Sequence, residues 1–171
     1  MIVGDGTEKA NLERMCTRLG IGERSHFPGF ISVKDGLPAL YRMAAVFVMA
    51  SQIETQGLVL LEAAACALPI VAVKATCLHE IVHEGENGFL LMPGDINGLA
   101  RRITWLVQNP VRAREMGQVG NRMVESHAVE KTIDAYEDFY RAAILSARQA
   151  NSIFSPTTAA PIRATHSGES G

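Results

Sequence analysis

SQIETQGLVLLEAAACALPIVAV, residues 51–73, is the stretch that decides the fold. It holds two carboxylates, Glu54 and Glu62, with seven residues between them. The polar residues at its start indicate a loop, and the small and apolar residues that follow indicate a helix beginning near Leu58. The apolar run at residues 70–73 is typical of a buried strand. We therefore expect a loop, a helix and a strand in succession, with one carboxylate before the helix and the other inside it.

The start of this helix suits a phosphate ligand. The first N–H groups of a helix have no partner inside the helix and carry partial positive charge, and Gly57 lets a ligand approach the backbone closely. A carboxylate accepts hydrogen bonds from a pair of vicinal hydroxyls. Eight residues of helix span about 12 Å, so Glu54 and Glu62 could flank a diphosphate, one holding a sugar and the other a ribose. The plain alternative is that an acidic residue near its N-terminus stabilises any helix.

Helical and strand patterns alternate along the rest of the chain, which predicts an α/β fold. We expect Thr7 and Asp95 to cap the helices that follow them, and Gly20 to end the first helix. Ligands in open α/β sheets bind at the carboxyl ends of strands, and Glu54 follows a predicted strand almost directly. The expected architecture is a Rossmann-like parallel sheet with helices on both faces. Its strands are predicted at residues 1–3, 26–30, 45–49, 70–73 and 88–92, and its helices at residues 7–19, 37–44, from 58 onward, 96–108, from 110 to about 127, and 127–149.

A resemblance to a known family rests on six segments, in the family's order: GDGTEKANLE, HFPGF, LPALYRMAAVFVMAS, ETQGLVLLEAAACALPIVA, EIVHEGENGFLLMPGD and LVQNPVRAREMGQVGN. Across about residues 2–140 the chain resembles the C-terminal, donor-binding lobe of the GT-B retaining glycosyltransferases with a Glu-x7-Glu motif (glycosyl transferases group 1). The resemblance starts in the middle of the family's pattern. It implies a single nucleotide-sugar-binding lobe over residues 1–150 that lacks the lobe's first strand and helix.

The resemblance also implies roles for the residues of the motif. Glu54 would contact the donor sugar, and Glu62 would bind the ribose hydroxyls. The backbone of Gly57, Leu58 and Val59 would meet the diphosphate. The co-substrate would be a UDP-, GDP- or ADP-sugar, with no other cofactor and no metal, and the sugar would pass to an acceptor with retention of configuration.

Further positions follow from the same resemblance. In the family the backbone just after the glycine of HFPGF meets the nucleobase, so Phe30 and Ile31 are candidates for this contact. The open alternative is that Phe27 and Phe30 are core residues. Gln56, a further candidate at the donor site, stands where the family often has Phe. Ala67 stands where the family often has Gly, in a turn that precedes the strand at residues 70–73.

The sequence departs from the family in its positive charges. In the family, an N-terminal lobe binds the acceptor, and an Arg and a Lys near the start of the C-terminal lobe bind the donor phosphates. Here no Lys or Arg occurs between Arg42 and Lys74, although electrostatic stabilisation is usually the largest catalytic contribution. We expect a fragment with little activity alone, which depends on a separate acceptor-binding lobe or chain. The alternative is a non-catalytic nucleotide- or partner-binding domain.

A second motif, His79-Glu80-x-x-His83, matches the zinc-hydrolase signature HExxH. Two His one helical turn apart can bind zinc, with the Glu as general base. A third ligand is required, and Glu86 and Phe89 occupy the positions where the extended motif has Gly and His. We therefore rank a zinc hydrolase as a distant third alternative and predict no metal site.

Composition limits the remaining classes of function. The chain has 171 residues, 47% of them hydrophobic, and a net charge of -2, which gives no reason to expect nucleic-acid binding. Its three cysteines, Cys16, Cys66 and Cys77, are expected to be reduced thiols. No signal peptide or transmembrane segment is expected, so we predict a cytoplasmic location, with peripheral membrane association left open. Residues 151–171 are rich in Ser, Thr, Pro, Ala and Gly and are predicted to be a disordered tail.

Overall fold

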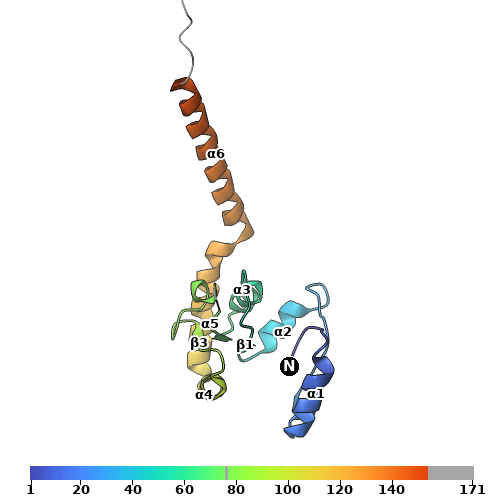
Figure 1. The fold of residues 1–171 in the computed structure, drawn as a ribbon. Helices are drawn as coiled ribbons and strands as arrows, with labels where there is room; N and C mark the ends of the chain where they lie inside the picture. Colours follow the sequence, from blue (N-terminus) through green and yellow to red (C-terminus); the bar gives the residue numbers. More distant parts are fainter. Residues whose placement is uncertain (76, 154–171) are drawn as a thin grey trace, which may run out of the picture. The chain divides into compact units, whose positions relative to one another are not determined.

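A computed structural model describes residues 1–75 and 77–153 (Figure 1). The chain divides between Ser126 and His127 into two compact units, each of which is described by itself. The described part of the second unit is essentially one helix, α6 (Val129–Ile153). The first unit contains, in chain order, α1 (Lys9–Arg18), the 3-10 helix η1 (Gly22–Arg24), α2 (Leu37–Met43), β1 (Phe47–Met49), α3 (Leu58–Ala65), β2 (Ile70–Val73), the 3-10 helix η2 (Leu78–Glu80), β3 (Gly88–Leu91), α4 (Ile96–Gln108) and α5 (Pro110–Met123), and a third 3-10 helix, η3 (Val124–His127), spans the division.

A three-stranded parallel sheet in the order β1-β2-β3 forms the centre of the first unit. Val71 of the middle strand lies opposite Val48 of β1 and Phe89 of β3. All four residues of β2 are buried, as its apolar sequence predicts. Their side chains alternate between two hydrophobic clusters, with Ile70 and Ala72 in one and Val71 in the other, because successive side chains of a strand point to opposite faces. The predicted parallel sheet with helices on both faces is confirmed.

Different helices cover the two faces of the sheet. On one face, Leu60 of α3 and Leu78 of η2 complete the cluster and are fully buried. On the other face, Leu106 of α4 and Met116 of α5 complete the second cluster and are buried. The predicted start of α3 at Leu58 and the predicted bounds of α4 are both confirmed. The sheet and α3 together form the scaffold on which the Glu54–Glu62 segment is held.

The turn between α3 and β2 contains a strained residue. Ala67 has a φ of 56°, in the left-handed region, which costs an L-residue roughly 1–2 kcal/mol. Its carbonyl oxygen packs so closely against α5 that a side chain at Gly117 would collide with it. The structure thus shows why this turn favours glycine at position 67 and why α5 carries glycine at 117.

The N-terminal segment differs from the prediction. Residues 1–3 and 26–30 were each expected to form a strand, but only a parallel bridge between Val3 and Gly29 is present. The Ile2 N–H donates to the His26 carbonyl at 2.8 Å, while the Met1 side chain is 64% exposed. The prediction of a buried strand here is wrong, because burial needs a packed neighbour that this short apolar run does not find.

α1 confirms the first predicted helix but not its cap. The N-cap residue is Glu8 rather than Thr7, and no side-chain hydrogen bond caps the helix. Gly20 follows the helix with a φ of 67°, as expected of a C-terminal glycine. No residue of α1 is buried, and its apolar residues Leu12 and Met15 are exposed.

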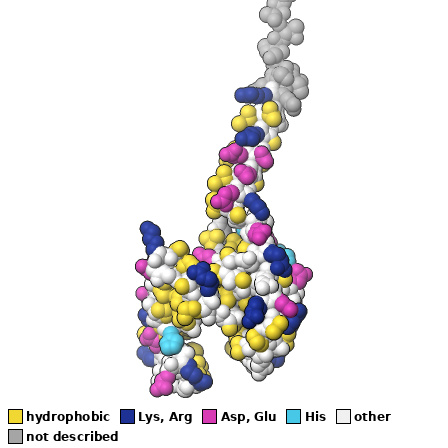
Figure 2. Space-filling view, turned by 180° about the vertical axis from the view of Figure 1, so that it is seen from behind, with side chains coloured by type: hydrophobic (Ala, Val, Ile, Leu, Met, Phe, Trp, Pro, Cys, Tyr) yellow, Lys and Arg dark blue, Asp and Glu magenta, His cyan; other side chains and the backbone are white. Residues whose placement is uncertain are grey.

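The last helices follow the sequence closely. Asp95 caps α4 by accepting a hydrogen bond from the Gly98 N–H at 2.7 Å, as predicted. α6 extends to Ile153, so the first three residues of the predicted tail are helical, and the predicted disorder of residues 154–171 lies outside the described residues. No helix within the described ranges is long and apolar enough to cross a membrane. Hydrophobic side chains lie exposed along α6 among charged ones (Figure 2), including Val129, Ile133, Tyr136, Phe139, Tyr140, Ile144 and Leu145.

Candidate functional site

The turn that starts α3 requires glycine. Gly57 is the N-cap residue of α3 and has a φ of 65° and a ψ of 30°, in the left-handed region. A Cβ at this position would lie 2.8 Å from Cδ1 of Ile81 and 3.4 Å from Cδ2 of Leu78. Both the left-handed backbone and the contact with the Ile81 side chain therefore disfavour a side chain at position 57. Gly57 thus packs against the core residues Ile81 and Leu78, and the turn leads directly into the first turn of α3.

Glu54 folds back onto this turn. Its Oε1 accepts three backbone hydrogen bonds, from the N–H groups of Thr55 at 3.0 Å, Gln56 at 3.3 Å and Gly57 at 3.0 Å. The N–H groups of Gly57, Gln56 and Thr55, in that order of effect, lower the pKa of the Glu54 carboxyl. Successive N–H groups that point to one place form a concave site for an anion. In this structure the anion that they hold is a carboxylate of the chain itself.

The first turn of α3 continues the same surface. Leu58 and Val59 are its first residues, and their side chains are 58% and 39% exposed. The N–H groups of Leu60 and Leu61 donate to the Gly57 carbonyl at 2.9 and 3.2 Å. The N–H groups of the first two residues have no acceptor within the helix by geometry. They extend the anion-accepting surface from the Gly57 turn onto the end of the helix.

Glu62, the second carboxylate, is exposed on α3 and contacts α2. Its Oε2 accepts a hydrogen bond from the Tyr41 hydroxyl at 2.8 Å. The Tyr41 ring in turn packs against Phe47, the first residue of β1, with the ring centres 5.7 Å apart. Burial, the hydrogen bond to Glu62 and the Glu62 charge raise the pKa of the Tyr41 hydroxyl. Sequence reasoning missed this contact, because no local signal links two residues 21 positions apart.

Phe30 and Ile31 come from a different segment of the chain. Phe30 is 76% exposed, so the alternative that it is a core residue is wrong. Ile31 and Phe27 are half-buried. Gly29, which lies between them in the chain, is buried and has a φ of 81°. No hydrogen bond joins Phe30 or Ile31 to the Glu54–Glu62 segment within the described parts of the chain. Their contact with a nucleobase therefore stays a prediction.

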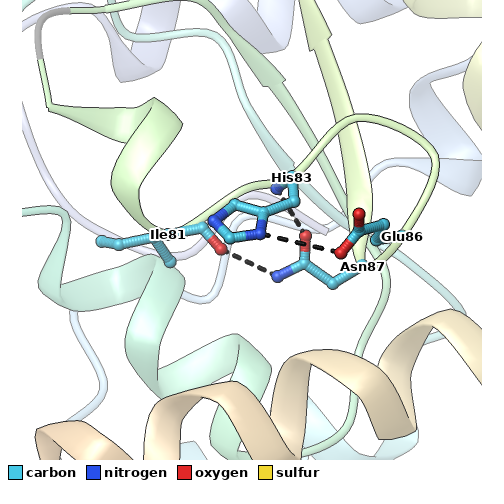
Figure 3. Close-up of polar contacts among 4 residues, drawn as sticks. All are labelled: Ile81, His83, Glu86 and Asn87. Atoms are coloured by element: carbon cyan, nitrogen blue, oxygen red, sulfur yellow. Dashed lines mark hydrogen bonds and ion pairs between the residues drawn. The ribbon is translucent and has the colours of Figure 1, made fainter.

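A buried amide holds the segment that supports the Gly57 turn (Figure 3). The Asn87 side chain is completely buried. Its Nδ2 donates to the Ile81 carbonyl at 2.8 Å, and its Oδ1 accepts from the His83 N–H at 2.7 Å. Ile81 is the residue whose side chain lies beneath Gly57. Asn87 thus fixes the backbone on which the turn rests, a role that sequence reasoning missed.

The same amide explains why the HExxH motif is not built as a zinc site. η2 covers only Leu78–Glu80, and the N–H of His83 donates to Asn87 rather than continuing a helix. The two His therefore do not lie one turn apart on a regular α-helix. Among residues 1–75 and 77–153, no three His, Cys, Asp or Glu side chains gather into a group that could hold a metal ion. His83 Nδ1 lies 3.8 Å from the Glu86 carboxylate instead.

The fold and the site define a class: a parallel α/β lobe that presents backbone N–H groups and two carboxylates after the carboxyl end of a strand. The chain belongs to the family Glycosyl transferases group 1, whose family model matches residues 1–123. The resemblance that the sequence motifs carry is confirmed. The match ends at the last residue of α5 and covers every element of the candidate site.

Known proteins of this family resemble the chain over most of its length. N-acetyl-alpha-D-glucosaminyl L-malate synthase of Bacillus anthracis is 31% identical over 141 residues, which cover 82% of this chain and 36% of that protein. Sucrose-phosphate synthase from Thermosynechococcus elongatus has a TM-score of 0.74 and 29% identity, over 84% of this chain and 38% of the neighbour. HepE of Anabaena in complex with UDP-glucose has a TM-score of 0.74 and 27% identity, over 82% of this chain and 40% of the neighbour. The chain spans well under half the length of each of these proteins.

Proposed function

We propose that the first unit of this chain binds the nucleotide-diphospho-sugar donor of a retaining sugar transfer. One observation carries the proposal: a row of backbone N–H groups runs from the Gly57 turn onto the end of α3, with a carboxylate at each end of the segment. Such N–H groups suit a diphosphate, and carboxylates suit sugar hydroxyls. A solved neighbour, HepE of Anabaena, was crystallised with UDP-glucose.

Each part of the segment then has a role. Glu54 accepts hydrogen bonds from hydroxyls of the donor sugar, and Glu62 accepts them from the ribose. The N–H groups of Gly57, Leu58 and Val59 donate to the diphosphate, with exposed Gln56 beside them. The backbone at Phe30 and Ile31 contacts the base, which the proposal leaves open among uracil, guanine and adenine. These two residues complete the set of site residues that the sequence predicts.

Binding the donor requires Glu54 to move. Its carboxylate occupies the N–H groups of residues 55–57, and a phosphate cannot share these donors with another anion. When the diphosphate takes the N–H groups, the Glu54 carboxylate is released toward the sugar. The two carboxylates then lie at the ends of the ligand rather than against its charged centre, which limits like-charge repulsion.

The chain supplies no cation for the leaving diphosphate within residues 43–73. Stabilisation of that developing charge is usually the largest contribution to catalysis, and N–H groups alone supply only part of it. Transfer therefore depends on positive charge and on an acceptor site from outside this segment. We propose that the 171-residue chain binds the donor but transfers sugar slowly by itself.

Calorimetric titration of the purified chain with UDP, GDP and ADP tests the proposal. We expect saturable binding of one nucleotide, and affinity about tenfold to a hundredfold weaker in Glu62→Ala because hydrogen bonds to a charged group are lost. Glu23→Ala, which removes an exposed carboxylate from η1, is the matched control and should bind as the wild type does. A folded chain that binds none of the three nucleotides would contradict the proposal and favour a non-catalytic partner-binding domain.

A further inference from the structure

Glu62 is exposed, yet one of its carboxylate oxygens has a fixed partner. Oε2 accepts the Tyr41 hydroxyl hydrogen bond at 2.8 Å, whereas no hydrogen bond to Oε1 occurs within the described residues. An exposed Glu side chain ordinarily samples several rotamers, and fixing it has an entropic cost. A hydrogen bond from a side chain that is itself held in place reduces that freedom before any ligand arrives. The orientation of Glu62 is therefore set by α2, not by α3 on which it lies.

Tyr41 is well held for this purpose. Its ring is half-buried and packs at a tilt of 49° on Phe47, which belongs to the sheet. α2 and α3 also contact each other at a second point, where the Cys66 thiol donates a weak hydrogen bond to the Pro38 carbonyl at 4.0 Å. A tyrosine hydroxyl is protonated throughout the physiological pH range, and burial and the neighbouring Glu62 raise the pKa of Tyr41 further. It is thus a permanent donor to the carboxylate.

We propose that Tyr41 is a positioning residue for the ribose contact: it holds the Glu62 carboxylate so that Oε1 and the free lone pair of Oε2 face the two ribose hydroxyls. An ionised carboxylate has about four acceptor sites, so one bond to tyrosine leaves enough for a vicinal diol. The inference rests on the proposed function, because it concerns the residue assigned to the ribose. It adds a residue from another helix, and from outside the Glu54–Glu62 segment, to the site.

Tyr41→Phe combined with deoxy-nucleotides tests the inference. This variant removes only the hydroxyl and keeps the ring contact with Phe47. We expect its affinity for the preferred ribonucleoside diphosphate to fall about three- to tenfold, the effect of one hydrogen bond. Its affinity for the 2′,3′-dideoxy diphosphate should equal that of the wild type, because that ligand has no hydroxyls for Glu62. The circular-dichroism spectrum and melting temperature of Tyr41→Phe verify that the fold is retained.

A double-variant comparison separates positioning from a general structural effect. In a Glu62→Ala background, Tyr41→Phe should have no further effect on ribonucleotide affinity, because its target is already absent. Equal losses for the ribo- and dideoxy-nucleotides, or unchanged ribonucleotide affinity, would overturn the inference while Glu62→Ala still weakens binding. If the wild-type chain binds no nucleotide, the proposed function fails and the inference fails with it. If Glu62→Ala binds a nucleotide as tightly as the wild type does, the ribose role of Glu62 and this inference fail, while nucleotide binding stands.

Discussion

Gly57→Ala is the substitution for which the structure gives the most definite expectation. The new Cβ would lie 2.8 Å from Cδ1 of Ile81, closer than side-chain carbons approach one another, and 3.4 Å from Cδ2 of Leu78. The backbone φ of 65° is also unfavourable for any residue with a Cβ. Both effects act at the turn that offers its N–H groups to the proposed ligand.

The expected magnitude is the sum of two contributions. The left-handed backbone costs alanine roughly 1–2 kcal/mol, and overpacking of a filled site costs about 1–3 kcal/mol. Gly57→Ala should therefore lower the free energy of unfolding by about 2–5 kcal/mol. Domains of this kind are stable by about 5–15 kcal/mol, so the variant should fold, with a large and measurable loss of stability.

Equilibrium urea unfolding, followed by circular dichroism and by the fluorescence of Trp105, measures the effect. Trp105 packs edge-on against Phe89 of the sheet with the ring centres 5.8 Å apart, so its emission reports on the core. Gly85→Ala is the matched control, because Gly85 has a φ of 78° but nothing within 4 Å of a Cβ. It should lose only the backbone contribution.

Removal of the colliding atom gives a second control. Ile81→Val deletes Cδ1, and in this background Gly57→Ala should regain about 1 kcal/mol of its packing cost. The reasoning is refuted if Gly57→Ala loses no more stability than Gly85→Ala, or if the loss is the same in the wild-type and valine backgrounds. Either result would mean that Ile81 does not support the turn.

Three further substitutions probe other features. Ala67→Gly should raise the free energy of unfolding by about 0.5 kcal/mol, since the relief of left-handed strain exceeds the entropic cost of glycine. A lower stability than the wild type would contradict the conclusion that the backbone at Ala67 is strained. Asn87→Ala should destabilise by about 2–4 kcal/mol because one buried and one partly buried backbone group lose their partners. Asn121→Ala, which loses one exposed bond to Ala65, should cost under about 1.5 kcal/mol; equal losses in the same unfolding assay would refute the role of Asn87 in holding the Ile81–His83 backbone. The folded-state pKa of Glu54 is lowered, so the stability that its ionised carboxylate contributes is present at neutral pH and is lost as the pH falls from the ordinary glutamate pKa through the folded-state pKa. The stability of Glu54→Gln should therefore depend less on pH in the acid range than that of the wild type. Identical plots of unfolding free energy against pH would exclude this linkage.

Local signals predicted the elements that carry the site. The helix start at Leu58 follows from a glycine turn and a run of small and apolar residues, and the cap at Asp95 follows from its place before a helical pattern. Burial of β2 follows from four consecutive apolar residues. The failures concern burial that depends on a distant neighbour. Residues 1–3 have the composition of a core strand, but exposure is set by what packs beside them and not by their own sequence.

The sequence predicted the order of the site residues along the chain, but not the contacts that hold them. The spacing of Glu54 and Glu62 placed both on one loop–helix segment, as observed. The bonds from Tyr41 to Glu62 and from Asn87 to Ile81 join different elements, and they depend on packing and rotamers that no sequence spacing encodes. The HExxH letters likewise do not show whether their segment is a regular helix: η2 covers only Leu78–Glu80, and the His83 N–H donates to the buried Asn87 side chain.

The interaction of Glu54 with its own turn bears on how two acidic residues can serve a diphosphate. Three N–H groups hold the carboxylate at distances of 3.0 to 3.3 Å, so the chain itself already compensates their partial positive charge. A diphosphate therefore gains less than the full attraction of these groups, because it must displace an anion that is already bound. In return, displacement moves a negative charge from the centre of the ligand to its sugar end. From the proposed function we therefore expect such a site to favour sugar-carrying donors over free phosphate, because hydroxyls beyond the phosphates give the displaced carboxylate new partners.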